Sequence, residues 1–262
     1  PISFSYICFM VSVYQVYQSL KSLLNKEQNG FITPQVFNNF AQMAQLNIYN
    51  EMFKELVDAK RASRQNFDPG RDKSLRKMTL EDLSMYLKSV PLENVGFNIA
   101  LGADTNAVNF LKPLDLSRIV SVEIADGSAP LESRVTCELI YDADDVSRIV
   151  GSNLSSPTDD FPVALVAGDR IEVIPSGNQS VILTYYAKPT SFNSSGEVDQ
   201  NPPMYAFKIL SGETFFDFEN SRDFMLPSHY LNEVVMEMAK LIGVRLRDQQ
   251  VTAFSTQEEI SE

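Results

Sequence analysis

The pattern of apolar positions in the first 60 residues is that of amphipathic helices. Apolar side chains recur there at three- and four-residue spacing, which places them on one face of a helix. The first stripe predicts a helix over roughly 12–25, which should end at Asn29-Gly30 because glycine tolerates the backbone that closes a helix. Thr33-Pro34 then predicts the N-cap and first turn of a second helix reaching about Lys60. These two helices can pack as an antiparallel hairpin.

Two further helices are expected from caps and spacing. Thr79-Leu-Glu-Asp82 resembles a capping box and predicts a short helix to about Lys88. Another strong apolar stripe predicts a long helix from Pro227 to about Asp248, which should pack beside the first two. The acidic tail beyond it is expected to be frayed.

From Leu116 the period of the apolar positions changes to two, which is the period of a β-strand. Strands are predicted at about 116–124 and 135–141, paired as a hairpin around Asp126-Gly127. Asp142 is expected to cap a short helix that Gly151 ends. Three more strands, at about 163–167, 170–174 and 180–187, complete a predicted antiparallel β-meander.

These elements predict an α+β fold: a helical bundle, made of the N-terminal helix hairpin and the long C-terminal helix, with an inserted antiparallel β-meander. The prolines, serines and asparagines of 189–204 predict a long loop rather than a core element, and a loop of this length is often partner-bound. The predicted parts are 1–90 (helical, with a basic connector at 58–77), 91–189 (β), 190–226 (loop or docking excursion) and 227–262 (C-terminal helix and tail).

Charge is unevenly distributed along the chain. The net charge of −12 argues against a dedicated nucleic-acid binder. Residues 58–77, however, carry seven Lys and Arg against three Asp, a net +4, so the remaining residues sum to −16. This segment predicts either a solvated connector or an arm for DNA or an acidic partner. Its cationic residues are Lys60, Arg61, Arg64, Arg71, Lys73, Arg76 and Lys77.

No motif for a phosphate loop, a zinc site or a nucleophile elbow occurs, so we expect no enzyme activity and no cofactor or metal. The lone His229 lies where the last helix should begin, which favours a capping or interface role. The cluster of Asp142, Asp144 and Asp145 predicts a helix cap followed by an acidic first turn. No stretch approaches about 18 consecutive apolar residues, so a soluble protein without membrane contact is expected.

Aromatic residues and prolines gather after residue 190, and they favour either a protein-docking segment or the edge of a core. The candidate docking residues are Phe192, Pro202, Pro203, Tyr205, Phe215, Phe216 and Phe218. Glu213 and Asp217 lie among them, and such a carboxylate pair could serve a glycan hydrolase, although solvated charge is the simpler interpretation.

Three stretches resemble virion structural proteins of tailed phages of Bacteroidetes, including crAss-like phages. The run Asn25-Lys-Glu-Gln-Asn-Gly-Phe-Ile-Thr-Pro-Gln-Val-Phe-Asn38 is similar to the opening of that family. Ile171-Glu-Val-Ile-Pro175, followed by Val181-Ile-Leu-Thr-Tyr-Tyr-Ala-Lys-Pro189, is similar to a later stretch in which a strand ends in Tyr-x-x-Lys-Pro. The helix at 227–248 lies where that family has one.

The resemblance implies a subunit of the phage neck or tail, a ring or head-to-tail adaptor around the DNA channel between portal and tail. Its implied partners are identical subunits, the portal and other neck or tail proteins, and passing genomic DNA contacted without sequence specificity. It implies a place in the virion after assembly in the host cytoplasm. Two alternatives stay open: a virion-associated glycan hydrolase, and a nucleic-acid accessory protein that uses residues 58–77.

Overall fold

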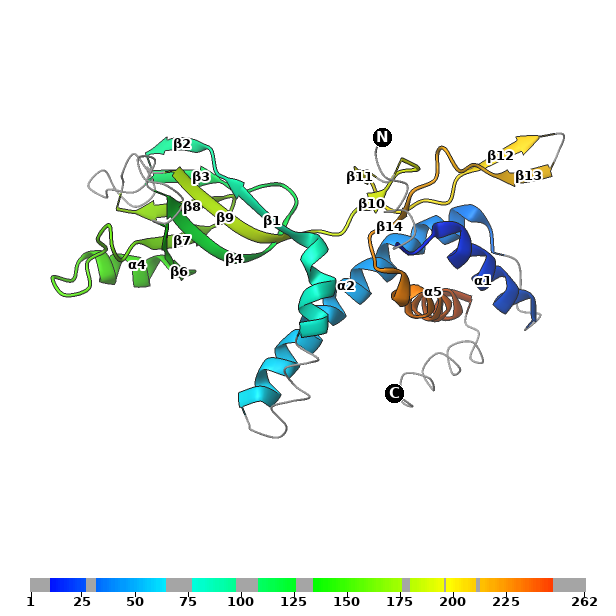
Figure 1. Ribbon diagram of the computed structural model, residues 1–262, viewed down its shortest axis with the longest axis horizontal. Helices are drawn as coiled ribbons and strands as arrows, with labels where there is room; N and C mark the ends of the chain where they lie inside the picture. The colour runs from blue at the N-terminus through cyan, green and yellow to red at the C-terminus, as the bar shows by residue number, and fades with distance from the viewer. Residues whose placement is uncertain are drawn as a thin grey trace. The chain divides into compact units, whose positions relative to one another are not determined.

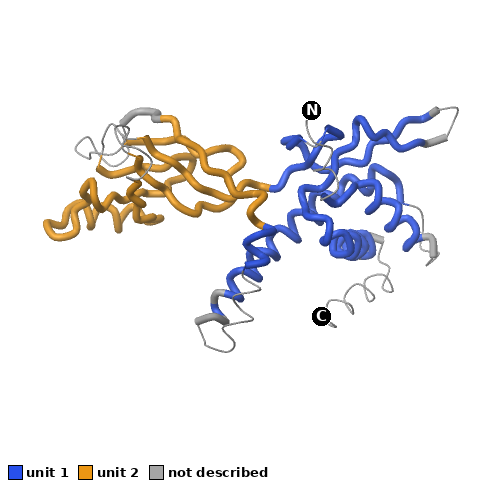
Figure 2. The backbone as a smooth tube through the Cα atoms, in the orientation of Figure 1, with its two compact units in different colours: residues 1–82, 189–262 blue, residues 83–188 orange. Residues whose placement is uncertain are grey.

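The computed structural model forms two compact units, one made of residues 1–82 and 189–262 and the other of residues 83–188 (Figure 2). Helices and several antiparallel sheets make the protein α+β, as the sequence predicts (Figure 1). The structure describes residues 10–26, 32–64, 77–97, 108–125, 134–175, 180–195, 197–210 and 213–246.

The first unit contains the helices α1 (Val13–Lys26), α2 (Pro34–Arg64) and α5 (Leu231–Leu246), the last preceded by the 3-10 turn Ser228–Tyr230. All three lie close to their predicted bounds, and α5 packs against both α1 and α2. Their apolar stripes are buried, which explains why each segment is helical: a helix with one apolar face is stable when that face is covered. The buried stripes include Val16, Leu20, Phe37, Ala41, Val234 and Met238.

Helix α2 continues to Arg64, past its predicted end at about Lys60, so the first residues of the predicted basic connector (58–77) are helical. The capping box at Thr79 also needs correction. Residues 77–83 are helical, so Lys77 and Met78 precede Thr79 within the helix. The helix does not reach Lys88 either, because the 3-10 turn Ser84–Tyr86 leads directly into β1 at Leu87.

The segment 190–226, expected as a loop, contains five short strands. These are β10 (Ser191–Phe192), β11 (Val198–Asp199), β12 (Phe207–Leu210), β13 (Glu213–Phe216) and β14 (Asp223–Phe224). β10 lies between β11 and β14, whereas β12 and β13 form a separate hairpin. Strands β10, β11 and β14 have two residues each, too few to show a period of two in the sequence, so composition suggested a loop.

The second unit contains two sheets. The first has the order β1-β9-β4-β5, with β1 (Leu87–Pro91), β9 (Ser180–Ala187), β4 (Leu116–Ala125) and β5 (Arg134–Thr136). The second has the order β2-β3-β8-β7-β6, with β2 (Asn94–Phe97), β3 (Val108–Leu111), β8 (Arg170–Ile174), β7 (Val163–Ala167) and β6 (Glu138–Ile140). Alternate side chains of both sheets form one buried core, which includes Phe110, Val122, Ile171, Val173, Leu183 and Tyr185.

The predicted hairpins β4–β5 and β7–β8 are confirmed, but the strands do not form one meander. β9 pairs with β4 and β1, not with β8. The strand expected at 135–141 divides at Cys137: β5 pairs with β4, and β6 pairs in parallel with β7 in the other sheet. Alternation identifies the buried face of a strand, but it does not identify the neighbouring strand.

Helix α4 (Ala143–Val150) forms as predicted. The Asp142 carboxylate accepts the Asp144 N–H at 3.0 Å and caps the helix, and the Gly151 N–H donates to the Ser147 carbonyl at 3.0 Å at its end. Asp145 forms an ion pair with Arg148 at 2.7 Å. Val146 covers one face of the second sheet. In the described part of the chain, no helix combines the length and apolar character that a membrane span requires.

Candidate protein-docking site

The hairpin of β12 and β13, residues Phe207–Phe216, exposes several large apolar side chains of the first unit, and we call it the docking hairpin. Phe207 pairs with Phe216 and Lys208 with Phe215, so Phe207 and Ile209 share one face while Phe215 lies on the other. Ile209 is 67% exposed, Phe215 48% and Phe207 37%. Among the described residues, the two strands pair only with each other.

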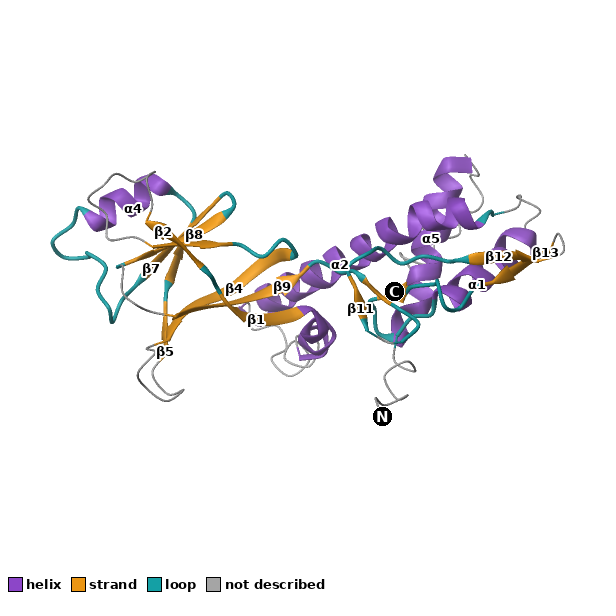
Figure 3. Ribbon diagram, turned by 90° about the horizontal axis from the view of Figure 1, so that it is seen from above, coloured by secondary structure: helices purple, strands orange, loops and turns teal. Residues whose placement is uncertain are grey.

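Aromatic side chains hold the root of the docking hairpin against α1 and α2. The Phe216 ring lies 4.8 Å from the Tyr14 ring and 5.0 Å from Tyr205, centroid to centroid. Tyr205 in turn stacks on Tyr17 at 4.1 Å, and Tyr17 contacts the edge of Phe37 at 5.4 Å. Such ring pairs add to the free energy of apolar burial, so the cluster fixes the hairpin to the helices. Figure 3 shows the hairpin beside α1.

Asn38 of α2 anchors the strand leading into the hairpin through two hydrogen bonds. Its Nδ2 donates to the Tyr205 carbonyl at 3.1 Å, and its Oδ1 accepts the Tyr205 N–H at 2.8 Å. Burial raises the pKa of the Tyr205 and Tyr17 phenols, because the charged form is disfavoured away from water. The Tyr17 hydroxyl donates to the Ile32 carbonyl at 3.1 Å.

The turn after β13 is held by Asp217, a carboxylate that is almost fully buried. The Asp217 carboxylate accepts a hydrogen bond from Asn220 Nδ2 at 2.7 Å and forms an ion pair with Lys208 Nζ at 2.9 Å. These hydrogen bonds, from Asn220 first and then Lys208, outweigh burial and lower the pKa of Asp217. The Ser221 hydroxyl donates to the Asp217 carbonyl at 2.6 Å and accepts the Ala206 N–H at 3.0 Å, closing the turn.

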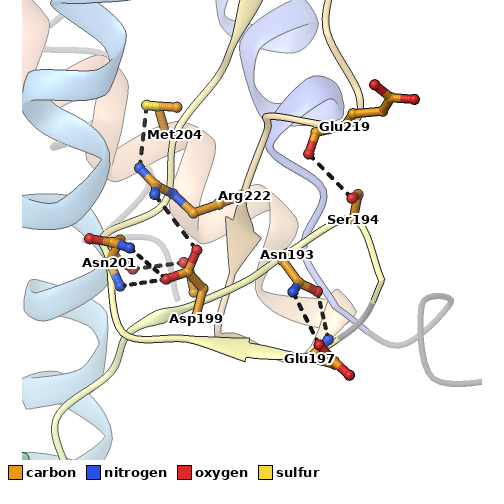
Figure 4. Close-up of polar contacts among 9 residues, drawn as sticks. Asn193, Ser194, Glu197, Asp199, Asn201, Met204, Glu219 and Arg222 are labelled. Carbon is orange, nitrogen blue, oxygen red and sulfur yellow. Dashed lines mark hydrogen bonds and ion pairs between the residues drawn. The ribbon is translucent and has the colours of Figure 1, made fainter.

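A second polar network fixes the strands beside the hairpin (Figure 4). Arg222 lies 3.6 Å from the Asp199 carboxylate, and Asp199 accepts the Asn201 N–H at 3.0 Å and its Nδ2 at 2.7 Å. The hydrogen bonds from Asn201 and the nearby Arg222 lower the pKa of Asp199 despite some burial. Arg222 and Met204 exchange two backbone hydrogen bonds, at 3.0 and 2.9 Å. Ser194 Oγ donates to the Glu219 carbonyl at 3.3 Å.

The candidate docking residues therefore lie in three different environments. Phe215, Phe218 and Pro202 are exposed, and Phe192 and Phe216 are half-buried. Tyr205 is only 6% exposed and Pro203 is buried, which corrects the expectation that they offer contact surface. Both lie where the segment packs on the helices, so they stabilise the hairpin root.

Sequence reasoning missed three exposed residues of this surface: Phe207, Ile209 and Tyr14. A signal for two of them exists in Phe207-Lys-Ile209, which alternates apolar and charged residues before Ser211-Gly212. This is the pattern of a strand entering a tight turn.

The structure describes part of the predicted basic segment. Lys60, Arg61 and Arg64 lie at the C-terminal end of α2, and Lys77 begins the described part of helix 77–83. The Arg61 side chain is 74% exposed and lies 3.6 Å from the exposed Asp58. Such an exposed pair is weak, so the guanidinium is available to a partner. Arg71, Lys73 and Arg76 lie outside the described residues.

Near the start of α5, His229 and Tyr230 both contact Asp82. His229 Nε2 lies 3.4 Å from Asp82 Oδ2, and the Tyr230 hydroxyl donates to the same oxygen at 3.1 Å. His229 thus lies in the turn just before α5, but that turn has no side-chain cap, so the predicted capping role is not seen, and an interface role stays a prediction. In the described segments, no group of His, Cys, Asp and Glu side chains is arranged to hold a metal ion.

Comparison with protein-family models and with curated protein sequences found no match for this chain. The functional argument therefore starts from the docking hairpin and its anchored root.

Proposed function

We propose that this chain is a structural subunit of a phage virion that binds identical copies of itself and forms a ring. The observation that carries the proposal is the docking hairpin: it exposes Phe207, Ile209 and Phe215 while its root is fixed to α1 and α2. The ring belongs to the neck or tail, where it surrounds the DNA channel between the portal and the tail.

The physical reason is that an isolated two-stranded hairpin is marginally stable in water and gains most when a partner covers it. Both strands of the docking hairpin present edges without a neighbouring strand in the described chain, and such edges favour pairing with another protein. Because the Asn38 and aromatic contacts already order the root, binding costs little further conformational entropy.

Other features support the virion assignment. The similarity of Asn25–Asn38 and Ile171–Pro189 to phage virion proteins points to the neck or tail, with assembly in the host cytoplasm and without a membrane. In this proposal α1, α2 and α5 form the helical bundle and residues 83–188 form the β insertion. The net charge of −12 would let genomic DNA pass without adhering, because carboxylates repel phosphates.

A glycan hydrolase is not favoured at Glu213 and Asp217. Asp217 is only 5% exposed, and its carboxylate is held by Lys208 and Asn220, so it does not face a substrate as a glycosidase carboxylate must. The side chain of Glu213 lies outside the described residues.

Electron microscopy of the purified full-length chain tests the ring. Closed rings of uniform size are expected, and a chain that stays monomeric at every concentration would contradict the proposal. Peptide mass spectrometry of purified virions tests the location separately, because absence of the chain from particles would exclude a virion role.

A further inference from the structure

Backbone groups on the two outer edges of the docking hairpin have no partner within the hairpin. The Asp217 N–H donates to the Ala206 carbonyl at 3.0 Å, so these two residues form a hydrogen-bonded pair of the ladder. Along an antiparallel ladder such pairs alternate with pairs whose N–H and C=O groups point outward, away from the partner strand. Phe207 and Phe216, the next pair along the ladder, are therefore of the outward kind.

Two positions further along, Ile209 and Thr214 form a second outward pair by the same alternation. Strand β12 thus presents the backbone of Phe207 and Ile209 on its open edge, and β13 presents that of Thr214 and Phe216 on the opposite edge. The complement of an open strand edge is another strand edge. Because the outward groups of both edges lie at the same two levels of the ladder, a β12 edge fits a β13 edge in register.

Among the strands that the structure describes, those of the docking hairpin have the edges best suited to such pairing. The other edge strands β5, β6, β11 and β14 have three residues or fewer. Strand β1 ends in Pro91, and proline is one of the residues by which proteins block an open edge. The pairing of β2 shifts register between Asn94 and Gly96, and such an irregularity also disturbs an edge. The hairpin strands, in contrast, pair over four residues each without a shift.

We infer that the docking hairpins of neighbouring copies pair edge to edge, β12 of one copy with β13 of the next. The inference rests on the proposed self-association and names the contact that carries it. The contact is heterologous, because two different edges meet, and repetition of one heterologous contact generates a ring when the rotation closes. The strands alternate in direction along the shared sheet, so every neighbouring pair is antiparallel and all hairpin roots lie on one side.

Side chains add to the backbone contact. In register, Phe207 of one copy lies opposite Phe216 of the next, and cross-strand aromatic pairs stabilise a sheet. Ile209, which is 67% exposed, lies on the same face as Phe207, where the neighbouring strand covers it. Lys208 on β12 does not block the edge by its charge, because its Nζ is paired with Asp217 at 2.9 Å.

The spacing of strands determines where the hairpins lie in such a ring. Neighbouring strands are about 4.8 Å apart, so each two-stranded hairpin occupies about 10 Å of the circumference. A single helix with its side chains is about 10–12 Å wide, and the first unit contains α1, α2 and α5 besides the hairpin. The helices therefore fit only at a larger radius, which places the hairpins on the inner side of the ring, toward the channel.

Proline substitutions at the open edges test the contact, because proline lacks the N–H that an added strand needs. Ile209→Pro disables the β12 edge and Thr214→Pro the β13 edge, and both leave the hydrogen bonds inside the hairpin in place. Every contact between identical variants then includes one disabled edge. In native mass spectrometry of the full-length chain, each variant alone should be monomeric under conditions in which the wild type assembles. An equimolar mixture should form a 1:1 pair and nothing larger, because each variant keeps one intact edge.

Val198→Pro is the matched control. Val198 is an exposed residue of the edge strand β11. The neighbouring pair is hydrogen-bonded, since the Asn193 N–H donates to the Glu197 carbonyl at 3.0 Å, so the Val198 N–H also points outward. This variant should assemble as the wild type does. Circular dichroism verifies that all three variants are folded.

The variants also separate this contact from other modes of pairing. If Thr214→Pro alone still forms complexes, two β12 edges meet; if Ile209→Pro alone does so, two β13 edges meet. Either result overturns the inference, as does a mixture that stays monomeric while the wild type assembles, and in each case the proposed self-association stands. A monomeric wild type would instead contradict the proposed function.

Hydrogen exchange of the wild type provides a second measurement, which does not depend on how the variants fold. The outward amides of Ile209 and Thr214 should exchange at least about tenfold more slowly in the assembled chain than in the dilute monomer, because a neighbouring strand then accepts their hydrogen bonds. Unchanged exchange of both amides on assembly would overturn the inference.

Discussion

Gln45 and Met225, 180 residues apart in the sequence, are joined by a buried hydrogen bond in which the Gln45 side-chain oxygen accepts the Met225 N–H at 2.8 Å. The Gln45 Nε2 donates to the Thr190 carbonyl at 2.6 Å, so one side chain on α2 binds the backbone at both ends of residues 190–226. Gln45 is only 1% exposed. The segment 190–226 is thus fastened to α2 at both ends.

Replacing Gln45 with Leu should destabilise the protein by about 2–4 kcal/mol, because the buried Met225 N–H and the partly buried Thr190 carbonyl lose their partners while the side-chain volume is kept. Urea unfolding measures the free energy. The matched control is Gln42→Leu, on the exposed side of the same helix, which should change stability by less than about 0.5 kcal/mol. Equal effects of the two substitutions would show that the Gln45 hydrogen bonds do not secure the segment.

Because of the Asp223 carboxyl group in β14, the free energy of unfolding should decrease as pH rises from the acid range. Its carboxylate accepts the Val13 N–H at 2.7 Å at the start of α1, and burial raises its pKa above 3.8 by more than hydrogen bonds from Val13 and Ser12 lower it. The folded state therefore keeps this proton to higher pH than the unfolded state. Its contribution to stability is present below about pH 4 and is lost as pH rises through the folded-state pKa.

Asp223→Asn removes this titration. The free energy of unfolding of the wild type, taken relative to Asp223→Asn, should fall as pH rises above about pH 4 through the folded-state pKa. Urea unfolding of both proteins at a series of pH values from the acid range upward measures the difference. A difference that stays constant or grows with pH would contradict the account.

Asp115 should show the opposite dependence. It accepts Lys88 Nζ at 2.6 Å and the Tyr185 hydroxyl at 2.8 Å. Burial raises its pKa, but these two hydrogen bonds and the charge of Lys88 together lower the pKa below 3.8. The stabilisation is therefore present above about pH 4 and lost as pH falls through the folded-state pKa.

Asp115→Asn should cost about 1–2 kcal/mol at about pH 7, a discounted value because the carboxylate is partly exposed. The cost should shrink below about pH 4, where the wild type also loses its charge. Asp160→Asn, at an exposed position, serves as the control for stability at neutral pH. An Asp115→Asn protein as stable as the wild type at neutral pH would show that the Lys88–Asp115 pair does not stabilise the fold.

Helices α1, α2 and α5 and the Asp142 cap were predictable from the sequence because they depend on nearby residues, whereas the cap predicted at Thr79 was wrong. The stripes of α1, α2 and α5 and the Asp142 cap involve partners within a few positions. The pairing of β9 with β4 was not predictable, because it joins strands more than 50 residues apart and alternation is compatible with several neighbours.

The burial of single residues within 190–226 was not predictable from the sequence either. Tyr205 and Phe215 are both aromatic residues near prolines, yet one is buried and the other exposed. What separates them is contact with Tyr17 and Asn38, which lie more than 160 positions away in the sequence. The sequence located the aromatic segment, but only the long-range packing distinguishes its anchor from its surface.

Tyr205→Ala should therefore destabilise the first unit by about 3–5 kcal/mol, the usual cost of deleting a large buried aromatic side chain. Phe215→Ala should cost less than about 1 kcal/mol, because this ring is half exposed. Thermal or urea unfolding distinguishes the two. Similar costs for both would mean that the hairpin does not divide into a buried root and an exposed contact surface.

The most direct test of self-association through the docking hairpin is native mass spectrometry of the full-length chain beside the double variant Ile209→Ser with Phe215→Ser. Both substitutions lie on exposed residues, so the variant should keep its fold, which circular dichroism verifies. We predict that the wild type forms a complex of defined copy number and that the variant is monomeric at the same concentration. A wild type that stays monomeric, or a variant that forms the same complex, would contradict the account.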